Sequence, residues 1–310
     1  MPNLDSAQHF TKVAGFGLAV IDVLMATESI VLEEKNPISR QAIQIGGVIP
    51  TALATLTRLG IPTELHTIVG KDTLGDEIAT ILKHERVALD NVIENPDIET
   101  PFACVIVNKY SGARTIFYST GSFSTLTNTE YAATLRPDSR FLLVDGHNPM
   151  LTHAFIEKAH AQNIRVLLDM GNPKPGIEAL ACESDAIIVP HVYWKTISPD
   201  SPEKMIKDYL SKGPTLVVAT MEEKGCMVGT GETIFHKPSY KVTAADTNGT
   251  GDVFFGAFTY GLIRNWSLEK TAAFSCAAAA RSCAIFGKED KLPHSEAEVN
   301  EFIKTHTTTG

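Results

Sequence analysis

The regular alternation of short apolar runs with amphipathic stretches does most to limit what this chain can fold into. The apolar runs have the length of buried strands, and the stretches between them have the spacing of helices. Because strands that alternate with helices need right-handed crossovers, the pattern predicts an α/β fold, a mostly parallel sheet with helices on both faces. Strands are predicted at residues 13–21, 64–69, 141–144, 165–168, 186–189 and 216–219, and helices at residues 50–59, 74–86, 151–162, 202–210, 252–262 and 268–285.

Two regions interrupt this rhythm and predict antiparallel additions outside the main sheet. Residues 29–45 are polar with scattered β-branched side chains, and residues 102–118 contain two β-rich runs around Ser111-Gly112, which indicates a hairpin. The pattern alone leaves open whether these additions form a lid over an active site or ordinary edge strands. We expect one domain over residues 1–310, with lid segments at about 23–45 and 101–120.

Charge and composition argue against several classes of function. The chain of 310 residues has 27 Lys and Arg against 36 Asp and Glu, a net charge of −9, and no basic run, so a nucleic-acid partner is not expected. The polar N-terminus lacks a signal-peptide pattern, and the apolar run at residues 13–25 is too short to span a bilayer. Five cysteines without a CxxC pair indicate a reducing compartment. We therefore expect a cytoplasmic protein without a membrane partner.

One segment near the C-terminus combines glycines and acids in a pattern that indicates chemistry. Residues 246–252 read DTNGTGD and lie between an extended stretch and an apolar helix. Gly249 and Gly251 allow a tight turn and a close approach to a ligand, and the first amides of the helix favour phosphate oxygens. A carboxylate at Asp252 could accept a proton from an attacking hydroxyl. These features suit phosphoryl transfer, although the residues alone also allow Asp246 and Asp252 to be turn and capping residues.

The same segment resembles the DTxGAGD signature of the PfkB, or ribokinase-like, family of carbohydrate kinases. The resemblance implies that Asp252 is the catalytic base and that an anion hole is formed by the amides of Gly249, Thr250 and Gly251. Thr250 replaces the usual Ala, which is a mild change because the amide does the binding. The implied fold is a ribokinase-like, doubly wound α/β domain with a small β-lid. The implied activity is ATP-dependent phosphorylation of a hydroxyl group of a small sugar.

The resemblance extends through the N-terminal half of the chain. Residues 46–51 (GGVIPT) and Arg58-Leu59-Gly60 resemble the GGxxxN…RLG signature of the family, and residues 69–75 resemble its VGxDxxG. Thr51 stands where the family usually has Asn and offers fewer hydrogen-bonding groups, so a different substrate preference is expected. The substrate-binding residues implied by the resemblance are Asp22, Gly46, Gly47, Thr51 and, on the lid as in ketohexokinase-like members, Arg114.

Two positions depart from the family pattern. After the strand at residues 186–189 the family has NxxE, whose Glu organises Mg²⁺ and phosphate, whereas this chain has HVYW at residues 191–194. Residues 220–225 (TMEEKG) resemble the TxGxxG near the nucleotide, with Glu222 in place of the first Gly. The nucleotide contacts implied by the resemblance are Thr220, Gly225, Asp246, Thr247, Ala279, Cys283 and Gly287.

The resemblance also implies the cofactors and leaves alternatives open. It implies ATP and Mg²⁺, and it points to a monovalent cation near Asp246, while the residues that hold metal stay unknown. A homodimer through the edges of the lid is a further expectation. The alternatives are a nucleoside or sugar-phosphate kinase that uses Lys109 and Arg114, a ligand-binding or regulatory homologue without catalysis, and an NAD-binding oxidoreductase, for which Gly15 and Gly17 are a weak fingerprint.

Overall fold

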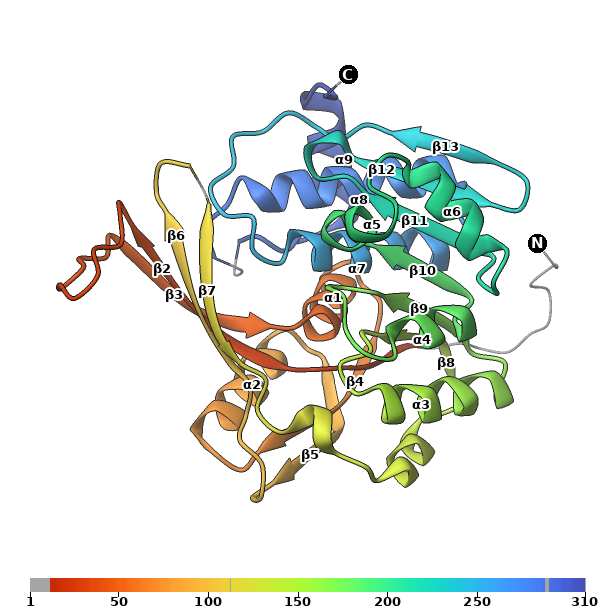
Figure 1. The fold of residues 1–310 in the computed structure, drawn as a ribbon, viewed down its shortest axis with the longest axis horizontal. Coiled ribbons are helices and arrows are strands. Elements are labelled where there is room, and N and C mark those ends of the chain that lie inside the picture. Colours follow the sequence, from red (N-terminus) through yellow and green to blue (C-terminus); the bar gives the residue numbers. More distant parts are fainter. Residues whose placement is uncertain (1–11, 112, 288–289, 310) are drawn as a thin grey trace.

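The computed structural model describes residues 12–111, 113–287 and 290–309. The polar N-terminal residues 1–11 and Gly112, at the expected hairpin turn, lie outside the described residues. Figure 1 shows a large sheet between helices, with a smaller sheet to one side. Within the described ranges, no helix combines the length and the apolar character needed to cross a bilayer.

The main sheet of the described chain has nine strands in the order β13-β12-β11-β10-β9-β8-β1-β4-β5. In this spatial order, all neighbouring strands between β11 and β5 pair in parallel. At the other edge, β12 and β13 add an antiparallel hairpin. The strand order reverses between β1 and β8, and open α/β sheets bind ligands at the carboxyl ends of strands at such a point. The bounds are β1 (Lys12–Phe16), β4 (Thr63–Gly70), β5 (Ala88–Asn95), β8 (Ser139–Val144), β9 (Arg165–Asp169), β10 (Ala186–Val189), β11 (Leu216–Thr220), β12 (Cys226–Thr230) and β13 (Ile234–Lys237).

Helices cover both faces of this sheet, so the predicted doubly wound α/β fold is confirmed. One core, which includes Phe255 and Phe258, lies under α1 (Val48–Arg58), α2 (Thr73–His84), α7 (Thr250–Ile263), α8 (Leu268–Cys283) and α9 (Glu296–Thr305). The other core, in which Phe16 stacks on Phe155, lies under α3 (Pro149–Ala161), α4 (Ile177–Glu183), α5 (His191–Ile197), α6 (Pro202–Leu210) and the 3₁₀ turns Phe123–Thr125 and Thr129–Thr134. Burial on both faces explains why strands such as β10 are continuously apolar.

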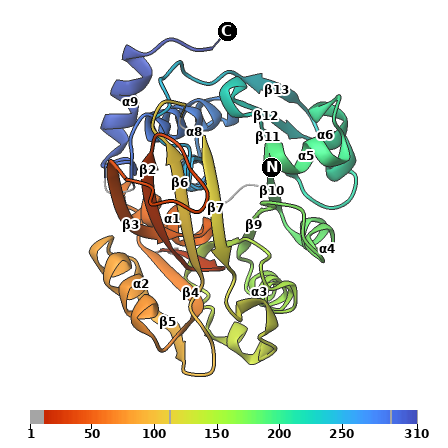
Figure 2. The same cartoon turned by 60° about the vertical axis from the view of Figure 1, so that its left-hand side comes forward.

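A second, small sheet has the strand order β3-β2-β6-β7. Its strands are β2 (Val20–Thr27), β3 (Arg40–Gly46), β6 (Phe102–Asn108) and β7 (Arg114–Ser119). The antiparallel pairing of β6 with β7 confirms the hairpin predicted for residues 102–118, and β3 pairs antiparallel with β2. Figures 1 and 2 show the four strands side by side and apart from the main sheet. On one face, Leu24, Val105 and Val107 form a small core with Phe286.

The apolar run predicted as one strand at residues 13–21 is divided between the two sheets, so that prediction was wrong. β1 ends at Phe16 in the main sheet, and β2 begins at Val20 in the small sheet. Buried Asp145 fixes the turn, because its Oδ2 accepts a hydrogen bond from the Leu18 N–H at 2.9 Å. In a continuous apolar run, the sequence has no change of pattern that would show where the chain leaves one sheet and enters another. Asp22, which directly follows the predicted strand at residues 13–21, therefore lies within β2 of the small sheet instead of at the end of a main-sheet strand.

Candidate active site

The loop at residues 246–252 leads directly into the first turn of α7. Gly249, the residue before the helix, has a left-handed backbone with a φ of 72°, which strongly favours glycine. The Asn248 N–H donates to Asp246 Oδ1 at 2.8 Å, and partly exposed Asp252 lies in the first helical turn. Amides in such a turn lack intrahelical acceptors and lie at the positive end of the helix dipole. The loop therefore offers an anion-binding position beside a carboxylate.

Buried Asp246 anchors this loop to the end of α8 and to Lys291. Its Oδ2 accepts from the Lys291 ammonium at 2.9 Å and from the Gly287 N–H at 3.4 Å. The N–H groups of Ala245 and Asp246 donate to the Cys283 carbonyl at 2.9 and 3.2 Å. Lys291 is itself fully buried. Where the resemblance points to a monovalent cation, the structure thus places the charged end of a lysine.

Asp22 connects the small sheet with the loop. The side-chain amide of Asn248 donates to Asp22 Oδ2 at 2.9 Å, and Asp22 is buried on β2. A Cβ at Gly46 would lie 2.4 Å from Asp22 Oδ1, so a glycine there leaves room for the carboxylate. Gly47 has a φ of 89°, and a Cβ there would lie 2.1 Å from the Leu18 carbonyl oxygen. The two glycines therefore let β3 and α1 approach β2 closely around Asp22.

Gln44 is a polar residue of this region that the sequence analysis missed. It is the cross-strand partner of Asp22, so the two side chains lie on the same face of the small sheet. It is only 4% exposed, and neither atom of its amide has a hydrogen-bond partner among the described residues. A buried polar group without a partner costs about 1–3 kcal/mol. The position of Gln44 between Ile43 and Ile45 was the available signal.

Thr51, which was also predicted to bind the substrate, lies inside the protein. Its side chain is fully buried in the first turns of α1. Its hydroxyl donates to the Gly47 carbonyl oxygen at 2.7 Å, which is one turn earlier in the helix. The hydroxyl thus stabilises the start of α1, whereas an Asn would present a longer side chain with two kinds of hydrogen-bonding atom.

Arg114 and Thr247 line a cavity of about 710 Å³, a volume typical of small-molecule sites. The Arg114 guanidinium, which projects from β7, donates to the Thr247 hydroxyl. Thr250 and Gly251 line the same cavity, and a Cβ built on Gly251 would meet no protein atom within 4 Å. The cavity lining also includes the predicted residues Thr220, Gly225, Ala279 and Cys283, and the apolar or aromatic side chains of Tyr240, Val242 and Phe254. The other predicted site residues do not line this cavity, namely Asp22, Gly46, Gly47, Thr51, Asp246, Gly249, Asp252 and Gly287.

The two departures from the family pattern touch each other in the structure. His191 Nδ1 lies 3.2 Å from a carboxylate oxygen of Glu222, and both residues line the cavity. Glu222 has a φ of 55°, a left-handed conformation that suits the Gly found there in the family. The Trp194 indole N–H donates to the Thr220 carbonyl at 2.8 Å. An aromatic residue and a His–Glu contact thus replace the NxxE pattern.

Two buried acids at the carboxyl edge of the main sheet were also missed. Asp169 ends β9, and Asp145 directly follows β8. Burial, together with the nearby charge of Asp252, raises the pKa of Asp169 to about 7. Burial likewise lowers the pKa of Lys174, whose ammonium donates to the Asp145 carbonyl oxygen at 2.7 Å. An acid directly after a predicted strand was the available signal for both.

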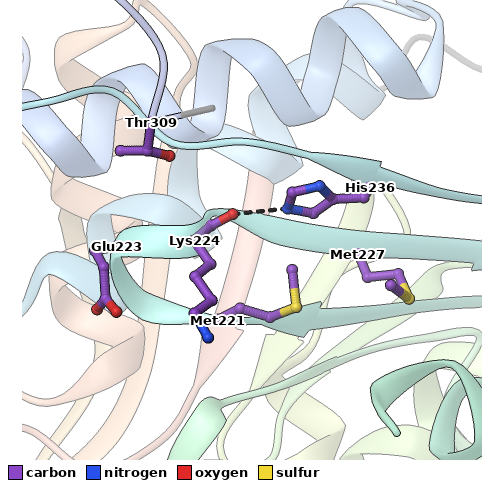
Figure 3. Close-up of a pocket in the computed structure, with 6 residues that line it drawn as sticks. All are labelled: Met221, Glu223, Lys224, Met227, His236 and Thr309. Carbon is purple, nitrogen blue, oxygen red and sulfur yellow. Dashed lines mark hydrogen bonds between the residues drawn. The ribbon is translucent and has the colours of Figure 1, made fainter.

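A second depression, with a volume of about 560 Å³, shares Glu223 and Thr309 with the lining of the larger cavity. Figure 3 shows the residues that line it, which are Met221, Glu223, Lys224, Met227, His236 and Thr309. The His236 imidazole Nε2 donates to the Lys224 carbonyl oxygen at 2.7 Å. None of the predicted site residues lines this depression. We therefore place the candidate active site at the larger cavity.

Comparisons with known proteins identify the class. The model of the pfkB family of carbohydrate kinases matches residues 11–294, and the chain belongs to this family. A ribokinase of Lactococcus lactis is 26% identical over 295 residues, which cover 91% of this chain and 94% of the relative. The structure of Arabidopsis thaliana ribokinase complexed with ribose and ATP has a TM-score of 0.80 and 19% identity, covering 95% of this chain and 99% of the other. A candidate ribokinase II of E. coli in complex with ATP and Mg²⁺ has a TM-score of 0.82 and 19% identity, covering 96% and 100%.

Proposed function

We propose that this protein transfers the γ-phosphoryl group of ATP to a hydroxyl group of a small sugar. One observation carries the proposal, namely that three distant segments meet at one loop. Asn248 donates to Asp22 on β2, and Thr247 accepts from Arg114 on β7, directly before the first turn of α7. An anion-binding position, a carboxylate and polar groups for an acceptor are thereby brought together, which is what phosphoryl transfer requires.

The roles of the residues follow from their positions. ATP occupies the cavity with its adenosine along the apolar wall and its phosphates toward Gly251 and Arg114. Asp252 accepts the proton of the attacking hydroxyl, whose oxygen bonds to the γ-phosphorus as the bond to the departing ADP oxygen breaks. Asp22 and Gln44 hold the hydroxyls of the acceptor. The developing charge is stabilised by the amides of Gly249, Thr250 and Gly251.

Mg²⁺ fits this site as a companion of the nucleotide. In the ranges that the structure covers, no three His, Cys, Asp or Glu side chains are grouped to hold a metal ion. Phosphate-bound Mg²⁺ needs only one or two protein carboxylates and keeps several waters. Asp252 and buried Asp169, whose charges influence each other, are the carboxylates that we propose for this role. When bound, Mg²⁺ would neutralise phosphate charge.

The acceptor is a neutral sugar in this proposal, and two contacts favour this over a sugar phosphate. The ammonium of Lys109 pairs with the Glu28 carboxylate at 2.5 Å. The guanidinium of Arg114 contacts Thr247 at the nucleotide cavity. Both cations considered for a phosphorylated acceptor thus have partners already, whereas the buried Gln44 amide suits hydroxyl groups.

A coupled ADP-release assay over a panel of sugars, sugar phosphates and nucleosides tests the proposal. We expect turnover with at least one neutral sugar and only background ATP hydrolysis without an acceptor. A sugar that raises the melting temperature but yields no ADP would support the regulatory alternative instead. Turnover with nucleosides or sugar phosphates alone would support kinase activity but contradict the proposal that the acceptor is a neutral sugar.

We also propose that the chain forms a homodimer through the outer face of the small sheet. Ile43, Val23, Cys104 and Phe117 are successive cross-strand neighbours on β3, β2, β6 and β7. Ile43 is 62% exposed and Phe117 59%, whereas Val23 and Cys104 between them are half-buried. The two exposed apolar ends of the row could stack on the same row of a second copy. Ile43→Lys should halve the mass measured by light scattering, whereas Leu32→Lys, in the β2–β3 loop, should not. A wild-type monomer would contradict the dimer.

A further inference from the structure

We propose that the ammonium group of Lys291 is a built-in cation that orients the anion hole and takes the place of the monovalent cation expected near Asp246. The inference rests on the proposed phosphoryl transfer and adds to it a positioning residue. Lys291 touches neither nucleotide nor acceptor in this account. It acts through the peptide groups that lead into α7.

Three oxygen atoms of the loop converge on the Lys291 Nζ atom. The distances are 2.9 Å to Asp246 Oδ2, 2.8 Å to the Asp246 carbonyl oxygen and 2.5 Å to the Asn248 carbonyl oxygen. Lys291 and Asp246 are both fully buried, so water does not compete for these contacts. Carboxylate and carbonyl oxygens coordinate K⁺ in proteins and also accept hydrogen bonds from an ammonium group.

The same contacts show that a monovalent metal ion does not fit these residues. An ion bound to the oxygens of Asp246 and Asn248 would have to displace the Lys291 ammonium. The displaced ammonium would then be a buried cation without these partners, which is strongly unfavourable. The cation that the family resemblance suggests is therefore supplied by the chain itself.

Peptide geometry explains how Lys291 orients the anion hole. In a trans peptide the C=O group and the following N–H group point in opposite directions, and the described chain contains no cis peptide bond. Because the carbonyls of Asp246 and Asn248 point toward Lys291, the N–H groups of Thr247 and Gly249 point away from it. Lys291 thus attracts the oxygen ends of two peptides and turns their donor ends away from itself. Of these two donors, the Gly249 N–H belongs to the proposed anion hole, and Thr247 lines the cavity.

The backbone that carries Lys291 is itself fixed. The Arg281 guanidinium on α8 donates to the carbonyls of Asp290 and Lys291 at 3.0 and 3.1 Å. The same guanidinium pairs with Glu298 on α9 at 2.5 Å. The ammonium therefore reaches the loop from a segment held by two helices, as a positioning group requires.

Salt titrations of the wild-type protein give the first test. We expect the affinity for a non-hydrolysable ATP analogue, measured by calorimetry with Mg²⁺, to agree within twofold in KCl, NaCl and tetramethylammonium chloride at equal ionic strength. The melting temperature should be equally indifferent. An affinity at least tenfold higher in KCl would overturn the proposal. No turnover is needed, so a failed kinase assay does not decide this result.

The variant Lys291→Ala, with Lys304→Ala on the exposed side of α9 as control, gives the second test. In tetramethylammonium chloride we expect Lys291→Ala to bind the analogue at least tenfold more weakly and to melt at a lower temperature, with partial recovery of both in KCl or NH₄Cl. The control should match the wild type. A Lys291→Ala protein that binds and melts like the wild type, or one that K⁺ and NH₄⁺ cannot restore, would contradict the proposal. If Lys291→Ala does not fold, Lys291→Met is tested in the same salts. A melting temperature that is higher in KCl or NH₄Cl than in tetramethylammonium chloride would support the proposal, and an equal melting temperature in all three salts would contradict it.

Discussion

The side-chain amide of Asn248 donates a hydrogen bond to Asp22 Oδ2 at 2.9 Å, across 226 positions of sequence. This contact joins the loop before α7 to the central strand pair of the small sheet. It places the candidate acceptor-binding carboxylate next to the candidate anion hole. A substitution at either residue should therefore weaken binding of the sugar acceptor more than binding of the nucleotide.

Asp22→Asn tests this division between acceptor and nucleotide. The substitution preserves the shape of the side chain but removes its charge, and hydrogen bonds to charged groups contribute about 1.5–3 kcal/mol. We expect the KM for the best sugar to rise at least about tenfold, while the KM for ATP stays within about twofold. Steady-state kinetics with each substrate varied in turn measure both values. A rise in the KM for ATP alone would contradict the assignment.

Gly251→Ala should separate stability from activity. A Cβ at Gly251 meets no protein atom within 4 Å, and Ala is favoured over Gly in a helix by about 1 kcal/mol, so the variant should melt at the same or a higher temperature. The methyl group would occupy the phosphate side of the first turn, so turnover should fall by at least about a hundredfold. Gly231→Ala, at an equally open position in the β12–β13 turn, is the matched control. Full activity in Gly251→Ala would show that phosphate lies elsewhere.

The fold could be predicted wherever the local pattern was strong. The predicted strand at residues 186–189 and helix at residues 202–210 coincide with β10 and α6, since β10 is an unbroken apolar run and α6 is amphipathic with a Pro at its start. β5 was missed because it is an edge strand with partners on one side, and its sequence ALDNVIEN mixes polar with apolar residues. The division of residues 13–21 between two sheets depends on Asp145, which is distant in sequence.

The site could be predicted only where its chemistry is local in sequence. The glycines and acids of residues 246–252 lie next to one another, so their pattern is visible without a structure. Gln44 and Lys291 have no such pattern. Their roles depend on a cross-strand pairing with Asp22 and on burial against the loop, which only the tertiary structure supplies.

Asp169 should make stability depend on pH. Its pKa of about 7 in the folded protein lies above the ordinary value of 3.8, so the folded state retains a proton that the unfolded state has released between these values. The stability that this proton contributes is fully present below about pH 4 and is lost as the pH rises through about 7. Asp169→Asn removes this dependence, so its melting temperature should exceed that of the wild type at pH 8 by more than at pH 5. A difference in melting temperature between the two proteins that stays constant from pH 5 to pH 8 would refute the assignment.

Gln44→Met tests whether the buried amide serves the acceptor. Met has a similar length but no hydrogen-bonding amide, and removal of a buried polar group without a partner should leave stability unchanged or raise it by about 1 kcal/mol. We expect the KM for the sugar to rise at least about tenfold. Chemical denaturation and steady-state kinetics provide the two readouts. A destabilised variant with unchanged kinetics would indicate a structural role.

The central claim is that Asp252 accepts the proton of the attacking hydroxyl beside the first turn of α7. The most direct measurement compares turnover with nucleotide affinity in Asp252→Asn. We predict wild-type folding by circular dichroism, an ATP-analogue affinity within about threefold of the wild type, and an ADP-release rate lower by about 10²–10⁴. Near-normal ADP release in a folded Asp252→Asn protein would contradict the account.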